Sequence, residues 1–527
     1  MACSRETSEV YAYFWAVKNK SIIQQLGVVL ILSGIALRLV VFYQNRSLFI
    51  DESNLARNIV EKNWIDFFQI LDYYQYAPPL FLCIEKCSTW MMGANEYALR
   101  LWPLVAACLS LFLIWAIAKR IKLEGYAPLI PLAWMVFSPL LVRYSTEVKQ
   151  YSTDVFVGLF LIWWVVSRGF PSSLKASEQG VLSTEWPAHF YWALIGGISV
   201  WLSMPSVFVL AGIGLLLVYE AWQRRANTEI QRWLIVIGFW LINFAGYYFI
   251  ILSKDLDKQA LIDYHSQYFF PLQWYKWEAW LQAGMVFQSI LRSAFGFTTL
   301  AYLVGGLGLL WGLRHLWQTK TFLFWLLLSP ILICLAVSSL GFYSLIPRLT
   351  LFFIPLLWLI FAHAFSFRWE KSLFVPKLGA LLPALGTISL LAILPLQHGY
   401  KYFYRPLLIE EIRPVLALTA AAYQSDDVIF VDHEAKPAFI FYQDLHSDRP
   451  FIPTQAIYLG NWNETPATWI TNFAENNERI WLVYSHLISA EALGKLKQHL
   501  EEIPPTYELA QKVEKTAAVS YLYVKKK

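Results

Sequence analysis

Three short clusters of ionisable residues stand out in a chain that is otherwise poor in charge. The first is the acidic pair Asp51 and Glu52, which directly follows an apolar run. The second is SPLLVRYSTEVKQYSTD at residues 138–154, and the third is YSLIPRLT at residues 343–350. Carboxylates can take a proton from a hydroxyl group, and Lys and Arg can stabilise a phosphate. Together these residue types suit the transfer of a group away from a phosphate.

Asp51 and Glu52 have two interpretations. They can be solvated carboxylates at the start of a helix, where the positive end of the helix dipole stabilises them. They can also be catalytic, with one of them acting as general base for an acceptor hydroxyl. Consecutive helical residues point about 100° apart, so only one of the two can face a substrate. Because Asp51 comes first and has the shorter, more rigid side chain, we expect Asp51 to be the base and Glu52 to support it.

The segment 138–154 places many polar groups between apolar runs. At helical spacing, one face would carry Arg143, Glu147, Tyr151 and Asp154, with Lys149 off to the side. A charge inside a membrane helix costs about 2.5 to 3.5 kcal/mol, so its presence indicates function. A mutually satisfied pair of Arg143 and Glu147 is the structural alternative, and it leaves Lys149 and Asp154 unexplained. We expect all five residues to bind the donor, with Glu147 and Asp154 both open as the second acidic site.

Arg348 and His265 complete the candidate residues. Arg348 enters an apolar run from its outer side, so it either snorkels to the interface or joins Lys149 in binding a phosphate. In the second case the two side chains converge, although about 200 residues separate them. His265 lies in an outer loop with several aspartates and is a weak candidate metal ligand, with a solvated histidine as the alternative. A divalent cation is therefore an open alternative, and no pattern predicts an organic cofactor.

The elements that carry these residues are predominantly membrane spans. The 527 residues are 57% hydrophobic and 15% charged, with a mean hydropathy of +0.45, whereas soluble proteins carry about 25% charged residues. The net charge of +5 is mild and its basic residues lie in short loops, which argues against nucleic acid as a partner. The five cysteines show no metal-ligand or disulfide spacing. The chain is thus predicted to be a polytopic α-helical membrane protein.

About eleven apolar runs approach the ~20 residues that cross a bilayer. The two runs divided by Ser203 and Pro205 can be one broken segment or two spans. The first run has no signal-peptide cleavage site after it and is expected to stay in the membrane. The runs are residues 25–43, 98–118, 126–142, 152–167, 190–203, 205–222, 233–252, 297–316, 321–338, 349–366 and 377–395.

Basic residues predict the orientation and the domains. Every second short loop, counted from the N-terminus, is basic, so those loops are expected in the cytoplasm. The opposite, periplasmic or lumenal side then receives the three clusters and everything after the last span. We expect a transmembrane domain at 1–396, with a first outer loop at 44–97, and an α/β domain at 397–527. Strands are predicted at 426–432, 480–484 and 519–524, and helices at 54–71 and 80–90 in the interface and at 490–500 in the outer domain.

Several motifs, taken in order, resemble one family. They are the acidic pair, Pro78-Pro79-Leu80, NEYALRLWPLVAACLSL at 95–111 and EVKQY at 147–151. This order resembles the GT-C class of membrane glycosyltransferases, in the branch of the protein O-mannosyltransferases and the lipid A aminoarabinose transferases, over about the first 370 residues. The resemblance implies a polyprenyl-phosphate sugar donor, an inverting displacement and a catalytic acidic residue in the first outer loop. Tyr76-Ala77 departs from the His, Lys or acidic residue of related members, so no metal or phosphate role transfers to this turn.

The predicted function is therefore the transfer of a sugar from polyprenyl phosphate to a hydroxyl of a lipid, glycan or protein, on the outer face of the inner membrane. Asp51 or Glu52 would be the base, and Lys149 and Arg348, with Arg143 or a divalent cation, would stabilise the leaving phosphate. A flippase or transporter is one alternative, but it would carry ionisable residues near the bilayer midplane. A glycan ligase or polymerase is another, and would rely on Arg and His in a late outer loop. The early acidic pair favours the transferase.

Overall fold

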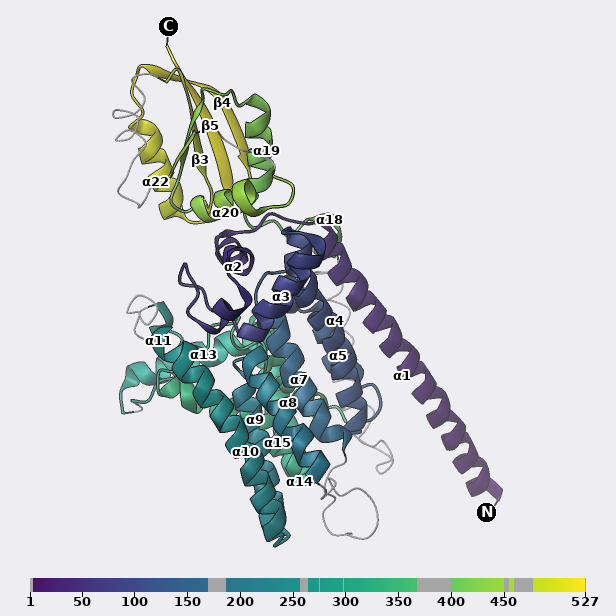
Figure 1. Cartoon of the computed structure of the whole chain (residues 1–527). Coiled ribbons are helices and arrows are strands. Elements are labelled where there is room, and N and C mark those ends of the chain that lie inside the picture. The colour runs from purple at the N-terminus through teal and green to yellow at the C-terminus, as the bar shows by residue number, and fades with distance from the viewer. Residues whose placement is uncertain are drawn as a thin grey trace.

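The computed structural model is a bundle of helices that carries a small sheet domain at one end (Figure 1). It describes residues 3–168, 186–255, 264–273, 275–296, 298–366, 400–449, 455–458 and 477–526. The bundle helices are α1 (Cys3–Tyr43), α4 (Glu96–Arg120), α5 (Leu129–Phe137), α6 (Pro139–Tyr144), α7 (Tyr151–Ser167), α8 (Trp186–Leu202), α9 (Ser206–Gln223), α10 (Asn227–Tyr247), α13 (Trp277–Phe295), α14 (Thr299–Thr319), α15 (Thr321–Ser339) and α16 (Ile354–His363).

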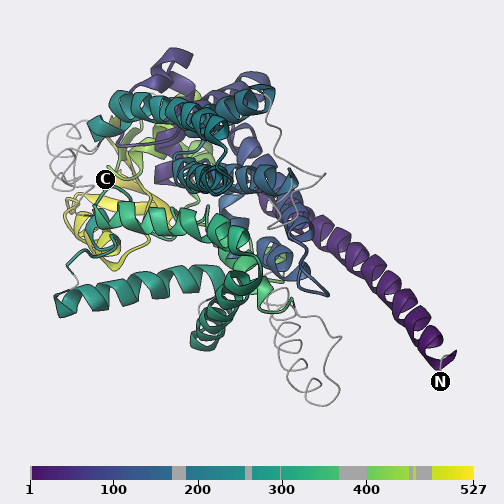
Figure 2. The same ribbon diagram turned by 90° about the horizontal axis from the view of Figure 1, so that it is seen from below.

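The bundle has the helices of a multi-pass membrane protein. Among the described residues, five segments are long and apolar enough to cross a membrane, namely Ser21–Tyr43 of α1, α4, α9, Asn227–Leu252 and α15. The bent pair α13 and α14 adds a sixth if it is one span, and α7, α8 and α16 are apolar but shorter. Ten of the eleven predicted apolar runs coincide with helices, and the run at 377–395 lies outside the described residues. α1 stands at the edge of the bundle and projects from it when seen from below (Figure 2).

The predicted run 126–142 is two helices rather than one. Pro139 has no N–H to continue α5, so α5 ends at Phe137 and α6 begins at Pro139. The last carbonyl groups of α5 then need other partners. Arg38, fully buried on α1, donates hydrogen bonds to the carbonyl oxygens of Met135 at 2.8 Å and Val136 at 3.3 Å. This buried charge therefore caps a broken helix.

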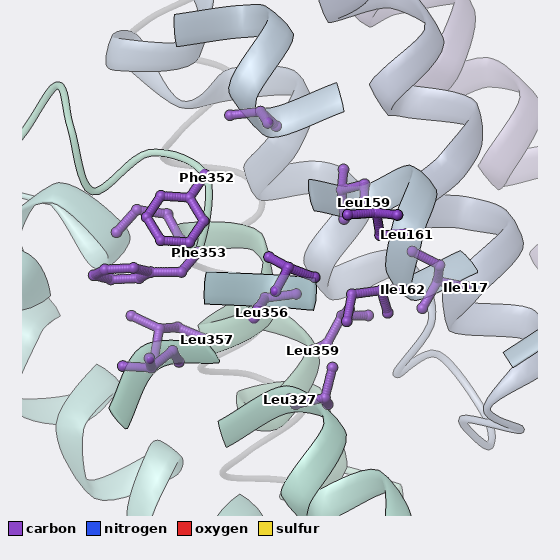
Figure 3. Packing of buried hydrophobic residues seen from close by; sticks show 14 of the residues in the cluster. Ile117, Leu159, Leu161, Ile162, Leu327, Phe352, Phe353, Leu356, Leu357 and Leu359 are labelled. Carbon is purple, nitrogen blue, oxygen red and sulfur yellow. The ribbon is translucent and has the colours of Figure 1, made fainter. Parts of the chain in front are cut away.

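Apolar packing in the core of the bundle places the polar segment 343–350 next to the polar segment 138–154. Leu159 and Ile162 of α7 lie in the same packed layer as Leu356 and Leu359 of α16 (Figure 3). Phe352, just before α16, stacks on Phe208 of α9 with ring centroids 5.8 Å apart. Because Arg348 is four residues before Phe352 and α7 begins at Tyr151, this packing fixes the Arg348 segment beside the start of α7.

Three short helices lie between α1 and α4, at the end of the bundle nearest the sheet domain (Figure 1). They are α2 (Ile50–Glu61), the 3-10 helix η1 (Trp64–Phe68) and α3 (Pro79–Met92). Lys86 of α3 donates to the carbonyl oxygens of Ile59, Val60 and Lys62 at 2.6 to 3.0 Å, and so caps the C-terminal end of α2. The helix predicted at 80–90 is confirmed, whereas the one at 54–71 is broken after Glu61.

The C-terminal domain is a five-stranded sheet of order β2-β1-β3-β5-β4. β1 is parallel to both β2 and β3, while β5 is antiparallel to β3 and β4. The predicted strands at 426–432, 480–484 and 519–524 and the helix at 490–500 are confirmed. The elements are α18 (Tyr400–Tyr404), α19 (Ile412–Ala422), β1 (Val428–Val431), α20 (Lys436–Ile440), the π-helix η4 (Phe441–Leu445), β2 (Gln455–Tyr458), β3 (Arg479–Tyr484), α22 (Ala490–Glu501), β4 (Tyr507–Lys515) and β5 (Ala518–Lys525).

The sheet domain is docked on the outer helices through both apolar and polar contacts. One face of the sheet, including Trp481, shares a continuous buried cluster with Leu55 of α2. Glu96, at the start of α4, is almost fully buried and accepts hydrogen bonds from Arg413 at 2.6 Å and Tyr442 at 2.8 Å. Such extensive burial places the domain in a fixed position over α2.

Candidate active site

The three polar clusters of the sequence meet at the end of the bundle that carries the C-terminal domain. Asp51 is in the first turn of α2, Lys149 is in the turn between α6 and α7, and Arg348 precedes α16. Lys149 interacts electrostatically with both Asp51 and Arg348, and Arg348 interacts with Asp51 and Tyr151. Lys149 and Arg348 are thus electrostatic neighbours, which is the relation that the predicted phosphate site requires.

The two residues of the acidic pair have different surroundings. Asp51 is partly exposed, whereas Glu52 is fully buried. Glu52 accepts hydrogen bonds from the Arg100 guanidinium at 2.7 and 3.1 Å and from the Val148 backbone N–H at 2.8 Å. Burial alone would raise the pKa of Glu52, but Arg100 and Arg46 outweigh it and the pKa lies below its usual value. Glu52 thus joins α2, α4 and the Lys149 turn as an ionised internal carboxylate.

The segment from Arg143 to Asp154 is not the continuous helix that its spacing suggested. α6 ends at Tyr144, α7 begins at Tyr151, and the residues between them form turns. Glu147 is fully buried and accepts a hydrogen bond from Arg143 at 2.6 Å, with Arg46 at 3.8 Å. Burial raises the pKa of Glu147 despite these two arginines. Arg143 and Glu147 therefore form the ion pair of the structural alternative, but the pair leaves the buried Oε2 of Glu147 without a hydrogen bond among the described residues.

Lys149 is held by a residue that sequence reasoning missed. Its side chain is 7% exposed, and its amine donates a hydrogen bond to the side-chain oxygen of Gln75 at 2.7 Å. Burial lowers the pKa of Lys149, Asp51 opposes this shift and Arg348 reinforces it. For Arg348, burial lowers the pKa, but Tyr151 and Asp51 overcome that effect, so the pKa is raised and the guanidinium is charged. The only available signal for Gln75 was its place next to the unusual Tyr76-Ala77 turn.

Asp154 and Tyr151 differ in their relation to this centre. Tyr151 packs edge-on against Tyr144, with ring centroids 4.9 Å apart, and lies near Arg348. Asp154 instead accepts a hydrogen bond at 2.7 Å from Ser203, in the break between α8 and α9. Of the two acidic residues left open by the sequence, Glu147 is committed to arginines and Asp154 to a serine.

His265 is an electrostatic neighbour of Arg348, and the described part of the chain gives it no partner metal ligands. It interacts electrostatically with Arg348, which lowers the pKa of His265 together with the larger effect of burial. Within the described ranges, no group of three or more His, Cys, Asp or Glu side chains could hold a metal ion. Asp257 and Asp263, which follow each other in the same predicted loop, lie outside those ranges. A guanidinium at this position favours an anion over a cation.

Comparison with known proteins gives matches at the level of structure. No protein-family profile and no curated protein sequence matches the chain. The structure of ArnT from Cupriavidus metallidurans in the apo state matches with a TM-score of 0.50 and 12% identity, over 97% of this chain and 98% of that chain. The same protein bound to undecaprenyl phosphate matches with a TM-score of 0.51 and 12% identity, over 94% of this chain and 97% of that chain.

A second kind of enzyme has the same architecture. The Archaeoglobus fulgidus oligosaccharyltransferase, solved in complex with Zn and sulfate, matches with a TM-score of 0.50 and 13% identity, over 94% of this chain and 72% of that chain. The matches cover almost all of this chain, so they include much of the C-terminal sheet domain as well as the bundle. The likeness therefore extends beyond the first 370 residues or so on which the sequence resemblance rested.

Proposed function

Because the chain has the GT-C fold, we propose that it is a membrane glycosyltransferase. It takes a sugar from a polyprenyl-phosphate donor and attaches it to a hydroxyl acceptor with inversion at the anomeric carbon. The observation that carries this proposal is the meeting of Asp51, Lys149 and Arg348 at one end of the bundle. ArnT, which has a similar fold, was solved with undecaprenyl phosphate bound. That lipid is the leaving group that such a reaction releases.

Lys149 and Arg348 stabilise the phosphate. The two cations approach from different elements, so they can contact different oxygens of one phosphate group. Both side chains are largely shielded from water, and shielding strengthens a charge interaction relative to bulk solvent. As the bond between the anomeric carbon and the phosphate oxygen breaks, negative charge grows on the phosphate. The two cations therefore stabilise the transition state more than the bound donor.

Asp51 is the general base. The acceptor oxygen attacks the anomeric carbon from the side opposite the phosphate, and its proton passes to the Asp51 carboxylate. The phosphate leaves with the electrons of the broken bond as polyprenyl phosphate, and the configuration at the carbon is inverted. Glu52 keeps Asp51 in place, because its bonds to Arg100 and Val148 fix the first turn of α2 against the Lys149 turn.

The orientation of the bundle supports a site on the extracytoplasmic face of the inner membrane. Basic residues such as Arg120 and Lys320 lie where α4 ends and α15 begins, and Lys320 donates a hydrogen bond to the carbonyl oxygen of Ile121 at 2.7 Å. α4 runs from the C-terminal domain at Glu96 to this basic end. The positive-inside rule then assigns Asp51 and the sheet domain to the outer side. The acceptor is a lipid, glycan or protein hydroxyl on that side.

Binding and release of undecaprenyl phosphate test the proposal. We expect purified protein to bind this lipid, and Lys149→Met and Arg348→Met each to weaken binding about 10- to 100-fold, because each removes a charge-assisted hydrogen bond of about 1.5 to 3 kcal/mol. Lys320→Met, a substitution of a partly buried lysine at the opposite end, is the matched control and should bind normally. EDTA in the same assay tests the predicted alternative of a divalent cation near His265.

The reaction itself separates the competing functions. Purified protein is added to membrane extracts that contain polyprenyl-phosphate monosaccharides, and mass spectrometry follows the lipid and the sugar. A glycosyltransferase releases polyprenyl phosphate as one monosaccharide is transferred. Transfer of a preassembled glycan would identify a ligase, and movement of intact donor across a sealed vesicle would identify a flippase. Equal binding of undecaprenyl phosphate by the wild type and the two site variants would refute the assignment of Lys149 and Arg348.

A further inference from the structure

The C-terminal domain faces the bundle with the carboxyl ends of its parallel strands. α20 follows β1 directly and packs against α2, so the carboxyl end of β1 faces the membrane domain (Figure 1). The chain passes from β1 to β2 on one side and later to β3 on the other side. In sheets of parallel strands, ligands bind at the carboxyl ends, beside the point where the order reverses. Here that point is between β1 and β3, above the outer helices.

His486 is in the loop that follows β3, at this end of the sheet. Its Nδ1 donates a hydrogen bond of 2.6 Å to Glu410, whose carboxylate can only accept, and its Nε2 is 3.7 Å from Glu434. Glu410 is almost fully buried, whereas the His486 side chain is 29% exposed. The backbone of His486 has a φ of 60°, which is uncommon for a residue other than glycine. A buried carboxylate thus orients a partly exposed histidine ring, and Glu434 lies beyond hydrogen-bond distance of its Nε2.

His486 is close enough to Asp51 for the two to interact electrostatically. The hydrogen bond to Glu410 raises the pKa of His486 more than burial lowers it, and Glu434 and Asp51 add to the rise. These three carboxylates are the charged groups that act on the imidazole. Asp51 therefore has Lys149 and Arg348 in the membrane domain and His486 of the sheet domain as electrostatic neighbours.

We infer that the C-terminal domain supplies His486 to the active site, where its Nε2 positions the acceptor hydroxyl against Asp51. This inference rests on the proposed function, and it assigns the donor phosphate to Lys149 and Arg348 and the acceptor to the other side of Asp51. Glu410 is the residue that positions His486. The acceptor is thereby presented by a rigid domain rather than by a membrane helix.

The charges around His486 also define the class of acceptor. The His486 ring has three carboxylates as electrostatic neighbours, those of Asp51, Glu410 and Glu434. Carboxylates accept hydrogen bonds from hydroxyl groups, whereas an acceptor that carries a phosphate or carboxylate here would be repelled. The acceptor group is therefore a neutral hydroxyl with no phosphate or carboxylate beside it.

Three substitutions in the full-length protein test the role of His486. His486→Ala removes the ring, His486→Gln keeps a polar group that can reach the position of Nε2, and His433→Ala alters an exposed histidine of the neighbouring loop after β1 as the matched control. Transfer is measured with increasing amounts of membranes from cells that lack the gene, which serve as acceptor. Undecaprenyl phosphate binding is measured on the same preparations.

We expect His486→Ala to raise the apparent KM for acceptor membranes about 10-fold or more, the effect of one hydrogen bond to a charged group. Undecaprenyl phosphate affinity should be unchanged, His486→Gln should recover part of the loss, and His433→Ala should behave as the wild type. Wild-type kinetics of His486→Ala would overturn the inference. So would an equal loss of lipid binding and transfer, because that would indicate a structural role only.

Two further measurements keep the inference separate from the proposed function and from misfolding. If the wild type neither binds nor releases polyprenyl phosphate, the proposed function has failed and not the placement of His486. If His486→Ala does not fold, Glu434→Gln, a change of the same size at the carboxylate 3.7 Å from Nε2, provides the second test and should also raise the acceptor KM. Mass spectrometry of the product should find the new sugar on a neutral hydroxyl group. A product with the new sugar on a phosphate or on an acidic sugar would overturn the acceptor class.

Discussion

Replacing Glu52 by Gln tests whether the buried neighbour of Asp51 holds the site together. Glu52 accepts two hydrogen bonds from Arg100 and one from Val148, with the Arg46 guanidinium at 4.0 Å. Gln has nearly the same size as Glu, but an NH2 group, which can only donate hydrogen bonds, replaces one of the two carboxylate oxygens. The buried Arg100 would then lose its paired carboxylate, and the buried Arg46 would keep only Glu147 at 3.8 Å. Removal of one partner of a buried ion pair costs about 3 to 5 kcal/mol of stability.

The pH dependence of this loss follows from the direction of the pKa shift. Arg100 and Arg46 hold the pKa of Glu52 below its unfolded value, against the effect of burial. A carboxylate with a depressed folded-state pKa contributes its stability above the unfolded pKa and loses it as the pH falls through the folded pKa. We therefore expect the difference in melting temperature between the wild type and Glu52→Gln to be largest near neutral pH and to narrow in acid.

Thermal unfolding of the purified protein, followed by the fluorescence of its 25 tryptophans, measures the effect. At about 2 °C per kcal/mol, the low end of the range because the chain is long, Glu52→Gln should melt roughly 6 to 10 °C below the wild type. Asp51→Asn is the matched control and should melt near the wild type, because Asp51 is partly exposed. A Glu52→Gln protein that melts like the wild type but has lost transfer would refute this reasoning and place Glu52 in catalysis.

Three other predictions concern the base, the phosphate site and the broken helix. Asp51→Asn should slow release of polyprenyl phosphate by at least about 100-fold with undecaprenyl phosphate affinity retained, and near wild-type release would remove Asp51 from the mechanism. Because burial lowers the pKa of Lys149, the affinity for undecaprenyl phosphate should decline with rising pH, at a lower pH than that at which an exposed lysine loses its proton. A binding series from about pH 7 to 10 measures this decline, and Lys149→Arg should abolish it. Arg38→Met should lower the melting temperature, because the buried carbonyl groups at the end of α5 lose donors worth about 1 to 3 kcal/mol each; an unchanged melting temperature would contradict the capping role.

Apolar patterns in the sequence were sufficient to predict the membrane spans and the inner strands of the sheet, but not its two edge strands. The spans are long apolar runs, and most residues of β1, β3 and β5 are buried on both faces of the sheet, so each run is visible locally. β4 has only its first and seventh residues, Tyr507 and Val513, buried, because it is an outer strand, and its polar sequence hid it. β2 is the other edge strand. Edge strands bury too few side chains to leave a clear pattern.

The pairing of the charged residues could be predicted only where it was local. Arg143 and Glu147 are four residues apart, and their contact is the one that helical spacing suggested. Glu52 instead pairs with Arg100, 48 positions away, and Lys149 with Gln75, 74 positions away. No local period links such residues, because helix packing brings them together. The assumption of an unbroken helix from Arg143 to Asp154 failed for the same reason, since tertiary contacts of the turn override local spacing.

The net charge of the ionisable residues in and around the candidate active site explains why so many of them are arginines. Two of its carboxylates are fully buried and paired, so they balance the arginines that hold the turn rather than acting on substrate. With every group ionised, these residues comprise five cations and three carboxylates, so their net charge is +2. The cations are Arg46, Arg100, Arg143, Lys149 and Arg348, and the carboxylates are Asp51, Glu52 and Glu147. A polyprenyl-phosphate sugar carries one negative charge at its phosphodiester, and the released phosphate monoester can carry two. A fixed field of this sign therefore favours the leaving group over the donor, which is the difference that accelerates the bond-breaking step.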